Sequence, residues 1–191
     1  MLLLLRLIRL ICGKAIIRAN LRILSQLTST GKVLKVLGAN VGENTSIFTD
    51  ICVYNGKNSS CSNLTIGSNV SIGPRCVFDL SSKITIEDDA AISAQVSFIT
   101  HLDVGNQPLR QKAPRTEGAI TVKRGAWIGV NTTILQNVDI GEFAMVGAMS
   151  LVNKTIPPKV VAFGIPCKVI RHFDIPGEGC HSHNEQPGGF S

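Results

Sequence analysis

One histidine stands out among the residues whose side chains could perform chemistry. His101 is the first histidine of the chain, and the other three lie within residues 172–183. An imidazole titrates near neutral pH, so it could take the proton of a hydroxyl that attacks an acyl group. The alternative for a single histidine is a buried, hydrogen-bonded structural role. The long irregular segment that follows, residues 102–119, favours catalysis, because such loops in compact domains are usually functional or disordered.

Two carboxylates are candidates to act with this histidine. Asp79 follows Phe78, one of the hydrophobic positions of a six-residue repeat, and Asp103 lies two residues after His101. Either carboxylate could orient the imidazole through a hydrogen bond. Asp79 could instead accept a hydrogen bond from an acceptor hydroxyl or lie at a solvated corner. The sequence leaves these roles open.

The cysteines and the other histidines form no recognisable nucleophile or metal site. No Ser or Cys falls beside His101 in a nucleophile motif, which disfavours a covalent acyl-enzyme. Cys180, His181 and His183 have no second ligand cluster that would complete a zinc site, so we expect no metal. The six cysteines have no repeated spacing, and no secretory signal precedes them. We therefore predict free thiols and a cytoplasmic protein.

The element that must position these residues is a repeat of six. An aliphatic β-branched residue recurs at every sixth position of the second half of the chain: Val122, Ile128, Ile134, Ile140, Val146 and Val152. Sandwich strands need turn signals every roughly 8–12 residues and do not hold one frame this long. The period predicts an all-β solenoid in which stacked coils bury one continuous core. Residues 54–63 and 102–119 break the frame and predict loops, the second of them protruding. Pro157 and Pro158 predict the end of the array, because prolines cannot donate to a ladder, and residues 160–171 are expected to form a final cover.

The net charge of +6 is concentrated near the N-terminus, where residues 1–42 contain Lys and Arg but no acid. Residues 1–27 have the spacing of an amphipathic helix, which could lie on the inner face of a membrane or pack on the solenoid or a partner subunit. Nucleic-acid binding is not indicated, because basic residues elsewhere are not clustered with aromatics. We divide the chain into a basic helical segment (1–35), a solenoid domain (36–172) and a disordered tail (173–191).

Four sequence blocks resemble the hexapeptide-repeat acyltransferases, particularly the maltose, galactoside and surface-polysaccharide O-acetyltransferases. They are Thr-His at 100–101, Gly-Ala-Trp-Ile-Gly at 125–129, the aliphatic repeats at 134–152, and Ala-Phe-Gly-Ile-Pro-Cys-Lys-Val-Ile-Arg at 162–171. The resemblance covers about residues 40–172. It implies a left-handed parallel β-helix, which the period alone does not determine, and a homotrimer with active sites between subunits.

The same resemblance assigns roles on the acceptor side. His101 matches the catalytic base of the family. Asp79 matches a position where galactoside-type relatives have an Asn that contacts the acceptor, and Asp103 remains a second acidic candidate. Trp127 matches an aromatic residue that lines the acceptor pocket of the neighbouring subunit, although it could equally be a core or interface residue.

On the donor side, the resemblance implies that acetyl-CoA is the acyl donor. In the family, backbone amides of small corner residues hold the pantetheine arm and basic residues bind the phosphates. The matching corner residues are Gly129, Val130, Gly147 and Ala148, and the matching basic residues are Lys154, Lys168 and Arg171.

The sequence therefore predicts an acetyl-CoA-dependent O-acetyltransferase that acts on a hydroxyl of a sugar or surface-polysaccharide precursor by direct transfer. A serine or antibiotic O-acetyltransferase, or a non-catalytic solenoid scaffold, remains an alternative. A serine acetyltransferase usually has a long helical N-terminal domain, and the roughly forty residues before the solenoid are too few to form one. A zinc-dependent carbonic anhydrase on this scaffold would need three histidine ligands, and only His101 lies within the repeats.

Overall fold

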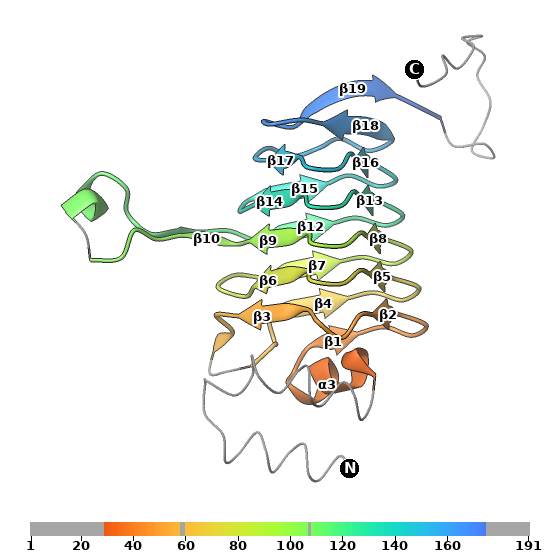
Figure 1. Ribbon diagram of the computed structural model, residues 1–191, viewed down its shortest axis with the longest axis horizontal. Helices are drawn as coiled ribbons and strands as arrows, with labels where there is room; N and C mark the ends of the chain where they lie inside the picture. The colour runs from red at the N-terminus through yellow and green to blue at the C-terminus, as the bar shows by residue number, and fades with distance from the viewer. Residues whose placement is uncertain (1–28, 58–59, 107, 175–191) are drawn as a thin grey trace.

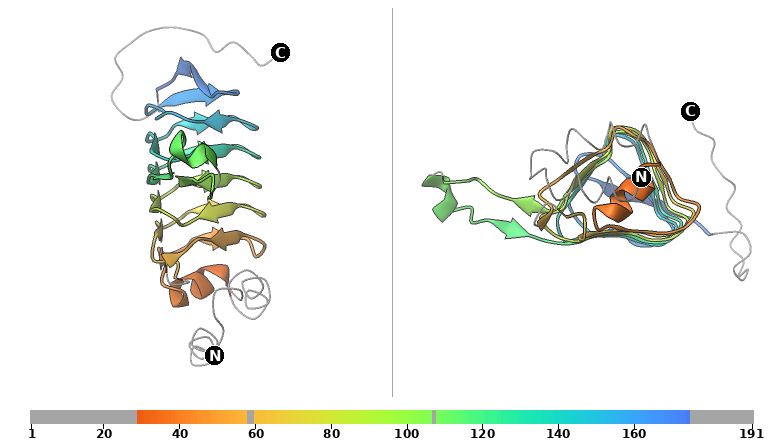
Figure 2. Two further views of the ribbon diagram at one scale, coloured as in Figure 1. Left: turned by 90° about the vertical axis from the view of Figure 1, so that its left-hand side faces the viewer. Right: turned by 90° about the horizontal axis from the view of Figure 1, so that it is seen from below.

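The structure, a computed structural model, describes residues 29–57, 60–106 and 108–174. The predicted helix over residues 1–27 and nearly all of the predicted tail lie outside these ranges. Within the described residues, short parallel strands stack into a triangular prism, as Figures 1 and 2 show. The predicted solenoid is confirmed.

Three parallel sheets form the sides of the prism, and each coil adds one strand to each sheet. Sheet A contains β1 (Asn40–Val41), β4 (Leu64–Ile66), β7 (Ile84–Ile86), β12 (Ile120–Val122) and β15 (Val138–Ile140). Sheet B contains β2 (Ser46–Ile47), β5 (Ser71–Ile72), β8 (Ala91–Ile92), β13 (Trp127–Ile128), β16 (Met145–Val146), β18 (Val160–Phe163) and the antiparallel β19 (Lys168–His172). Sheet C contains β3 (Cys52–Tyr54), β6 (Val77–Asp79), β9 (Ser97–Ile99), β14 (Thr133–Leu135) and β17 (Leu151–Val152).

The core is a column of aliphatic side chains with one aromatic pair. All six residues of the predicted period are buried, and each occupies the inward position of its strand. Parallel register places like residues on one another, as in Ile84, Ile120 and Val138 of sheet A. Phe78 and Phe98 stack in the same way, with ring centroids 5.0 Å apart. Burial of such side chains is the main stabilising contribution of the stack.

Separate elements cover the two ends of the stack. Helix α3 (Thr30–Val36) packs its buried Val33 and Leu34 against the first coil. At the other end, Pro157 and Pro158 do not stop the array as the sequence predicted. Strand β18 still joins β16 in parallel, and β19 then turns back antiparallel to it as a cover. The described residues contain no helix long and apolar enough to span a membrane.

The predicted protruding loop is an arm made of a two-stranded hairpin. Strands β10 (His101–Leu102) and β11 (Thr116–Glu117) pair in antiparallel fashion, and the 3₁₀ helix η2 (Pro108–Gln111) lies near the tip. The arm leaves the prism at the corner between sheets C and A, on the left of Figure 1. His101 is therefore placed where the arm joins the solenoid.

Candidate active site

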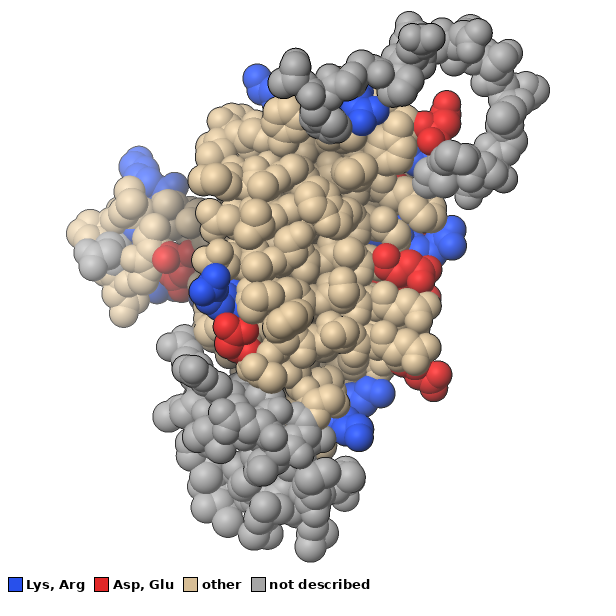
Figure 3. All heavy atoms as spheres, turned by 45° about the vertical axis from the view of Figure 1, so that its right-hand side comes forward, with Lys and Arg blue, Asp and Glu red and all other residues tan. Residues whose placement is uncertain are grey.

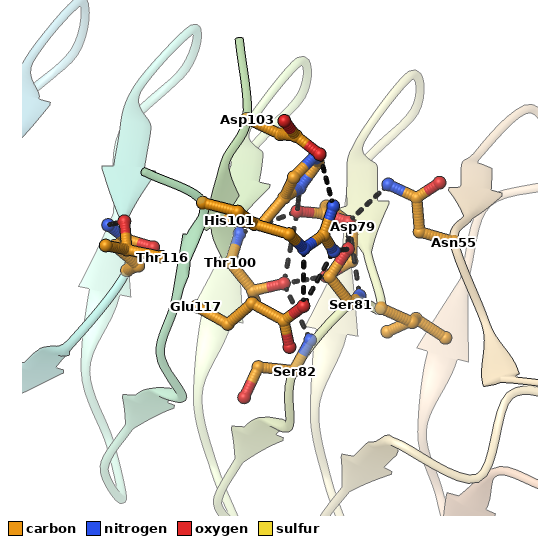
Figure 4. Close-up of polar contacts among 12 residues, drawn as sticks. Asn55, Asp79, Ser81, Ser82, Thr100, His101, Asp103, Thr116 and Glu117 are labelled. Atoms are coloured by element: carbon orange, nitrogen blue, oxygen red, sulfur yellow. Dashed lines mark hydrogen bonds and ion pairs between the residues drawn. The ribbon is translucent and has the colours of Figure 1, made fainter. Parts of the chain in front are cut away.

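His101 and Asp79 form a hydrogen-bonded pair at the base of the arm, as Figure 4 shows. Asp79 ends β6 in the second coil, and His101 follows β9 in the third, so coil stacking brings the two residues together. Phe78 points into the core, and strand alternation then directs Asp79 outward. Its Oδ2 atom lies 2.5 Å from Nδ1 of His101.

Asp79 points outward yet is fully buried, because polar neighbours close over its carboxylate. Its Oδ2 accepts a hydrogen bond from the Thr100 backbone N–H (2.9 Å), and its Oδ1 accepts from Asn55 Nδ2 (2.9 Å) and Ser81 N–H (3.2 Å). Burial by itself raises the pKa of Asp79. The hydrogen bonds from His101, Asn55 and Ser81 outweigh that effect and lower this pKa to about 2.

The ionisation state of Asp79 determines which ring nitrogen of His101 carries the hydrogen. A carboxylate that is ionised at neutral pH can only accept, so Nδ1 of His101 must be the donor in this pair. In the neutral imidazole, Nε2 is then an unprotonated acceptor. The His101 side chain is 20% exposed, so part of the ring is open to solvent. This arrangement suits a general base.

Asp103 does not contact His101. Its Oδ2 accepts a hydrogen bond from Arg115 Nη1 at 2.8 Å, and its Oδ1 accepts from the Gly105 N–H at 2.7 Å. The Arg115 hydrogen bond is the main cause that lowers the pKa of Asp103. Of the two carboxylates considered from the sequence, Asp79 therefore orients the imidazole and Asp103 braces the arm. The burial of Asp79 also leaves no exposed oxygen for the direct acceptor contact that was the alternative.

The four predicted pantetheine residues stack at the corner between sheets B and C. The N–H groups of Gly129 and Gly147 already donate to carbonyls of the next coil, at 2.7 and 2.8 Å. The N–H groups of Val130 and Ala148 make no hydrogen bond within the part of the chain that the structure describes, and both residues are exposed. A Cβ at Gly129 would lie 2.5 Å from the Ala148 nitrogen, so coil stacking itself requires glycine there.

The three predicted phosphate-binding cations lie toward the C-terminal end of the prism. Lys154 follows β17 at the corner between sheets C and A, which is the corner from which the arm leaves at an earlier coil. Lys168 and Arg171 lie on β19. All three are exposed, and none forms an ion pair within residues 29–57, 60–106 and 108–174. They are available to an anionic ligand.

One chain does not bring all the predicted site residues together. His101 lies at the corner of sheets C and A, whereas Val130 and Ala148 lie at the corner of sheets B and C, one strand of sheet C away. Trp127 is 39% exposed on the outer side of sheet B, beside Ala91 of β8. Among the described residues, no group of three His, Cys, Asp or Glu side chains could hold a metal ion.

Comparison with known proteins gives the family of this fold and site. No family model matches the chain. Galactoside O-acetyltransferase of Escherichia coli (strain K12) is 31% identical over 150 residues, which cover 78% of this chain and 71% of that protein. The chain belongs to the hexapeptide-repeat acetyltransferase family.

Two solved structures agree with this membership. A galactoside acetyltransferase in complex with coenzyme A superposes with a TM-score of 0.69 and 27% identity, covering 84% of this chain and 81% of that one. A hexapeptide-repeat acetyltransferase from Vibrio cholerae has a TM-score of 0.71 at 23% identity, covering 83% and 89%, and shows the fold alone. The resemblance found in the sequence and the left-handed parallel β-helix that it implied are confirmed.

Sequence reasoning missed several residues that surround the histidine of this acetyltransferase. Asn55, Ser81 and Thr100 all donate hydrogen bonds to Asp79, and Arg115 binds Asp103. A signal was present for Asn55, because it lies at the start of the polar break at residues 54–63, two residues after the repeat position Val53. Its backbone has a φ of 58°, which Asn tolerates better than most residues at a tight corner.

Asn55 is expected to be a positioning residue. Asn55→Ala removes one donor to Asp79 and should lower kcat roughly fivefold, the equivalent of one hydrogen bond of about 1 kcal/mol. The KM for acetyl-CoA should stay unchanged. Asn44→Ala is the matched control, since Asn44 has a similar φ of 53° at a corner remote from Asp79. Steady-state kinetics and thermal melting of both variants test this. Equal kcat values with equal losses of melting temperature would reduce Asn55 to a turn residue.

Proposed function

We propose that this acetyltransferase moves an acetyl group from acetyl-CoA to a hydroxyl of a sugar or a surface-polysaccharide precursor, with His101 as the general base. The observation that carries the proposal is the buried Asp79 carboxylate, which holds Nδ1 of His101 and leaves Nε2 as an acceptor at the arm. The relative that is a galactoside O-acetyltransferase supports a sugar hydroxyl as the acceptor.

The proposed reaction is a direct transfer. Nε2 of His101 takes the proton of the acceptor hydroxyl while its oxygen attacks the thioester carbonyl, so that a C–O bond forms. The C–S bond then breaks, and the coenzyme leaves as a thiol after it receives the proton from the imidazolium. Asp79 stabilises the imidazolium between these two steps, because its carboxylate is already ionised and within hydrogen-bond distance.

The donor side of the proposal uses backbone donors and free cations. Val130 and Ala148 offer N–H groups that can bind the amide carbonyls of the pantetheine arm. Lys154, Lys168 and Arg171 form no ion pair with any residue that the structure describes, and they are suited to the phosphates of the coenzyme. Gly129 and Gly147 contribute by letting the coils stack closely, and their N–H groups are already occupied.

We propose that three chains assemble so that one subunit completes the site of the next. His101 and the backbone donors of Val130 and Ala148 lie on different corners of one chain, so a neighbouring chain is needed to bring a base and these donors together. The face toward the viewer in Figure 3, on the side of sheet B, has charged side chains mainly at its edges. Its outward positions are uncharged from β2 to β18: Ser46, Ser71, Ala91, Trp127, Met145 and Val161. A flat uncharged face of this kind suits a subunit contact.

The expected assembly is a trimer at micromolar concentration, which sedimentation equilibrium measures directly. Trp127→Glu would place a charge in the proposed contact and should shift the protein toward monomers. Lys123→Glu, which changes a charge at the prism edge between sheets A and B, is the control and should remain trimeric. A wild-type protein that sediments as a monomer while it turns over substrate would contradict the shared site.

The proposed location is the cytoplasm, with residues 1–27 in contact with the inner face of the membrane. Four cysteines within the described residues are free, as expected in a reducing compartment. The basic residues of the segment would attract anionic headgroups. Co-sedimentation of the full chain with anionic and neutral vesicles tests the membrane contact.

The function itself is tested by thiol release from acetyl-CoA with a panel of acceptors. Galactosides, other neutral sugars, serine and an antibiotic alcohol should be compared at equal concentration. Thiol release that depends on a sugar is the expected result. Release with serine or the antibiotic alone would show that the acceptor is not a sugar. Binding of acetyl-CoA without turnover on any acceptor would favour a non-catalytic role.

A further inference from the structure

The two strands of the arm place four functional side chains on one of its faces. In the antiparallel pair, His101 lies opposite Glu117. Two residues farther along the arm, the same register places Asp103 opposite Arg115. These two side chains form an ion pair, with 2.8 Å between Asp103 Oδ2 and Arg115 Nη1. Because alternate residues of paired strands point to the same side, all four side chains share a face.

This face is turned toward the second coil. His101 contacts Asp79 there, and Arg115 Nη2 lies 3.5 Å from Ser81 Oγ. The opposite face is turned toward the fourth coil, where Gln136 donates to Thr116 at 2.7 Å.

The cluster is also open to a ligand. The side chains of Asp103, Arg115 and Glu117 are 27%, 38% and 42% exposed. They therefore border the histidine at a place that an acceptor can reach.

Within the cluster of Asp103, Arg115 and Glu117, a carboxylate oxygen remains without a partner, whereas the one guanidinium already pairs with two carboxylates. Arg115 directs Nη1 to Asp103, and both Nε and Nη2 to Oε1 of Glu117, at 2.7–2.8 Å. Oε2 of Glu117 has no hydrogen-bond partner in the portion of the chain that is described. Together with Asp79, the face combines three carboxylates with one guanidinium, a net charge of −2 apart from the imidazole.

We infer that Asp103, Arg115 and Glu117 form an acceptor subsite that takes an uncharged saccharide with adjacent hydroxyls and rejects an anionic one. The inference rests on the proposed function. Hydroxyl groups donate well to carboxylate oxygens, and such charge-assisted hydrogen bonds are stronger than neutral ones. A phosphate or carboxylate on the acceptor would meet two carboxylates at this face, while the charge of Arg115 is already balanced by its ion pairs with Asp103 and Glu117.

Two acceptors with the same free ring hydroxyls test this selectivity: methyl α-galactoside and α-galactose-1-phosphate. At low ionic strength, kcat/KM should favour the neutral galactoside by roughly tenfold or more, and added salt should narrow the ratio. Glu117→Gln keeps the shape and one acceptor oxygen but removes a charge. It should raise the KM for the neutral galactoside and reduce the selectivity several-fold. Asp139→Asn, the same change on the outer side of sheet A, should leave both acceptors unaffected.

Equal kcat/KM for the two acceptors, or a selectivity that Glu117→Gln leaves unchanged, would overturn the subsite. A variant that lowers kcat equally for both acceptors and also lowers the melting temperature would show that Glu117 only braces the arm, which overturns it as well. If neither acceptor causes thiol release from acetyl-CoA while calorimetry shows that acetyl-CoA binds, the proposal of sugar acetylation is wrong, and the proposed subsite is wrong with it. The first two results leave sugar acetylation intact, so the two kinds of failure are distinguishable.

Discussion

His101→Ala is expected to lower kcat by about 10²–10⁴-fold, the range in which a positioned general base contributes. The substitution removes the group that takes the hydroxyl proton but leaves the donor corner at Val130 and Ala148 intact. Affinity for acetyl-CoA, measured by calorimetry, should therefore stay close to that of the wild type. The melting temperature should also fall, because the buried Asp79 carboxylate loses its closest hydrogen-bond partner and keeps only the bonds from Thr100, Asn55 and Ser81.

The control for this variant is His172→Ala. His172 ends β19 on the exposed cover, opposite Val160, and touches neither Asp79 nor the arm. Its loss should leave turnover unchanged. If His101→Ala retains wild-type turnover with the sugar that the acceptor panel identifies, the assignment of the base is wrong and only the fold and family remain.

Asp79→Asn is expected to have the second largest effect, a loss in kcat of roughly 10²-fold or more, because an amide no longer fixes the tautomer of the imidazole. The new NH₂ group would also face donors. Thr100 N–H lies on one side of the present carboxylate and Asn55 Nδ2 on the other, so one oxygen cannot satisfy both. Buried mismatched donors cost about 1–3 kcal/mol, which a urea titration will detect. Asp139→Asn again serves as the control and should be neutral in both measurements.

The lowered pKa of Asp79 also predicts how stability depends on pH. Its native value of about 2 lies below the ordinary 3.8, so the native state favours the ionised form more strongly than the unfolded chain does. This contribution is fully present above roughly pH 4 and is lost as the pH falls through about 2. The free energy of unfolding of the wild type should therefore fall more steeply across this window than that of Asp79→Asn. Parallel slopes would show that other carboxylates dominate acid unfolding.

Much of the fold could be predicted from the sequence, because one physical requirement repeats along it. Each coil must bury an aliphatic residue at the same place, and Val122 and its successors show that requirement at a fixed period. The prolines at 157–158 misled the prediction of the end of the array. They interrupt sheet A after its bridge at Ile156, but they impose nothing on sheet B, where β18 still finds a parallel partner.

The candidate site was only partly predictable, because its contacts depend on stacking between coils. His101 could be identified by its type and by the long segment after it. The choice between Asp79 and Asp103 could not be made, since sequence proximity favoured Asp103 whereas coil stacking brings Asp79 to the ring. The roles of Gly129 and Val130 also needed the backbone, because only the ladder shows which N–H groups are already used.

The arm is inserted between the third and fourth coils, and these two coils still pair in regular parallel register. Ile84 and Ile120 lie in direct register across sheet A, although the entire arm separates them in sequence. The scaffold therefore does not constrain the length or composition of the insertion. A different insertion at this point would change the surroundings of His101, and with them the choice of substrate that we propose for the arm, without changing the stacking of the coils.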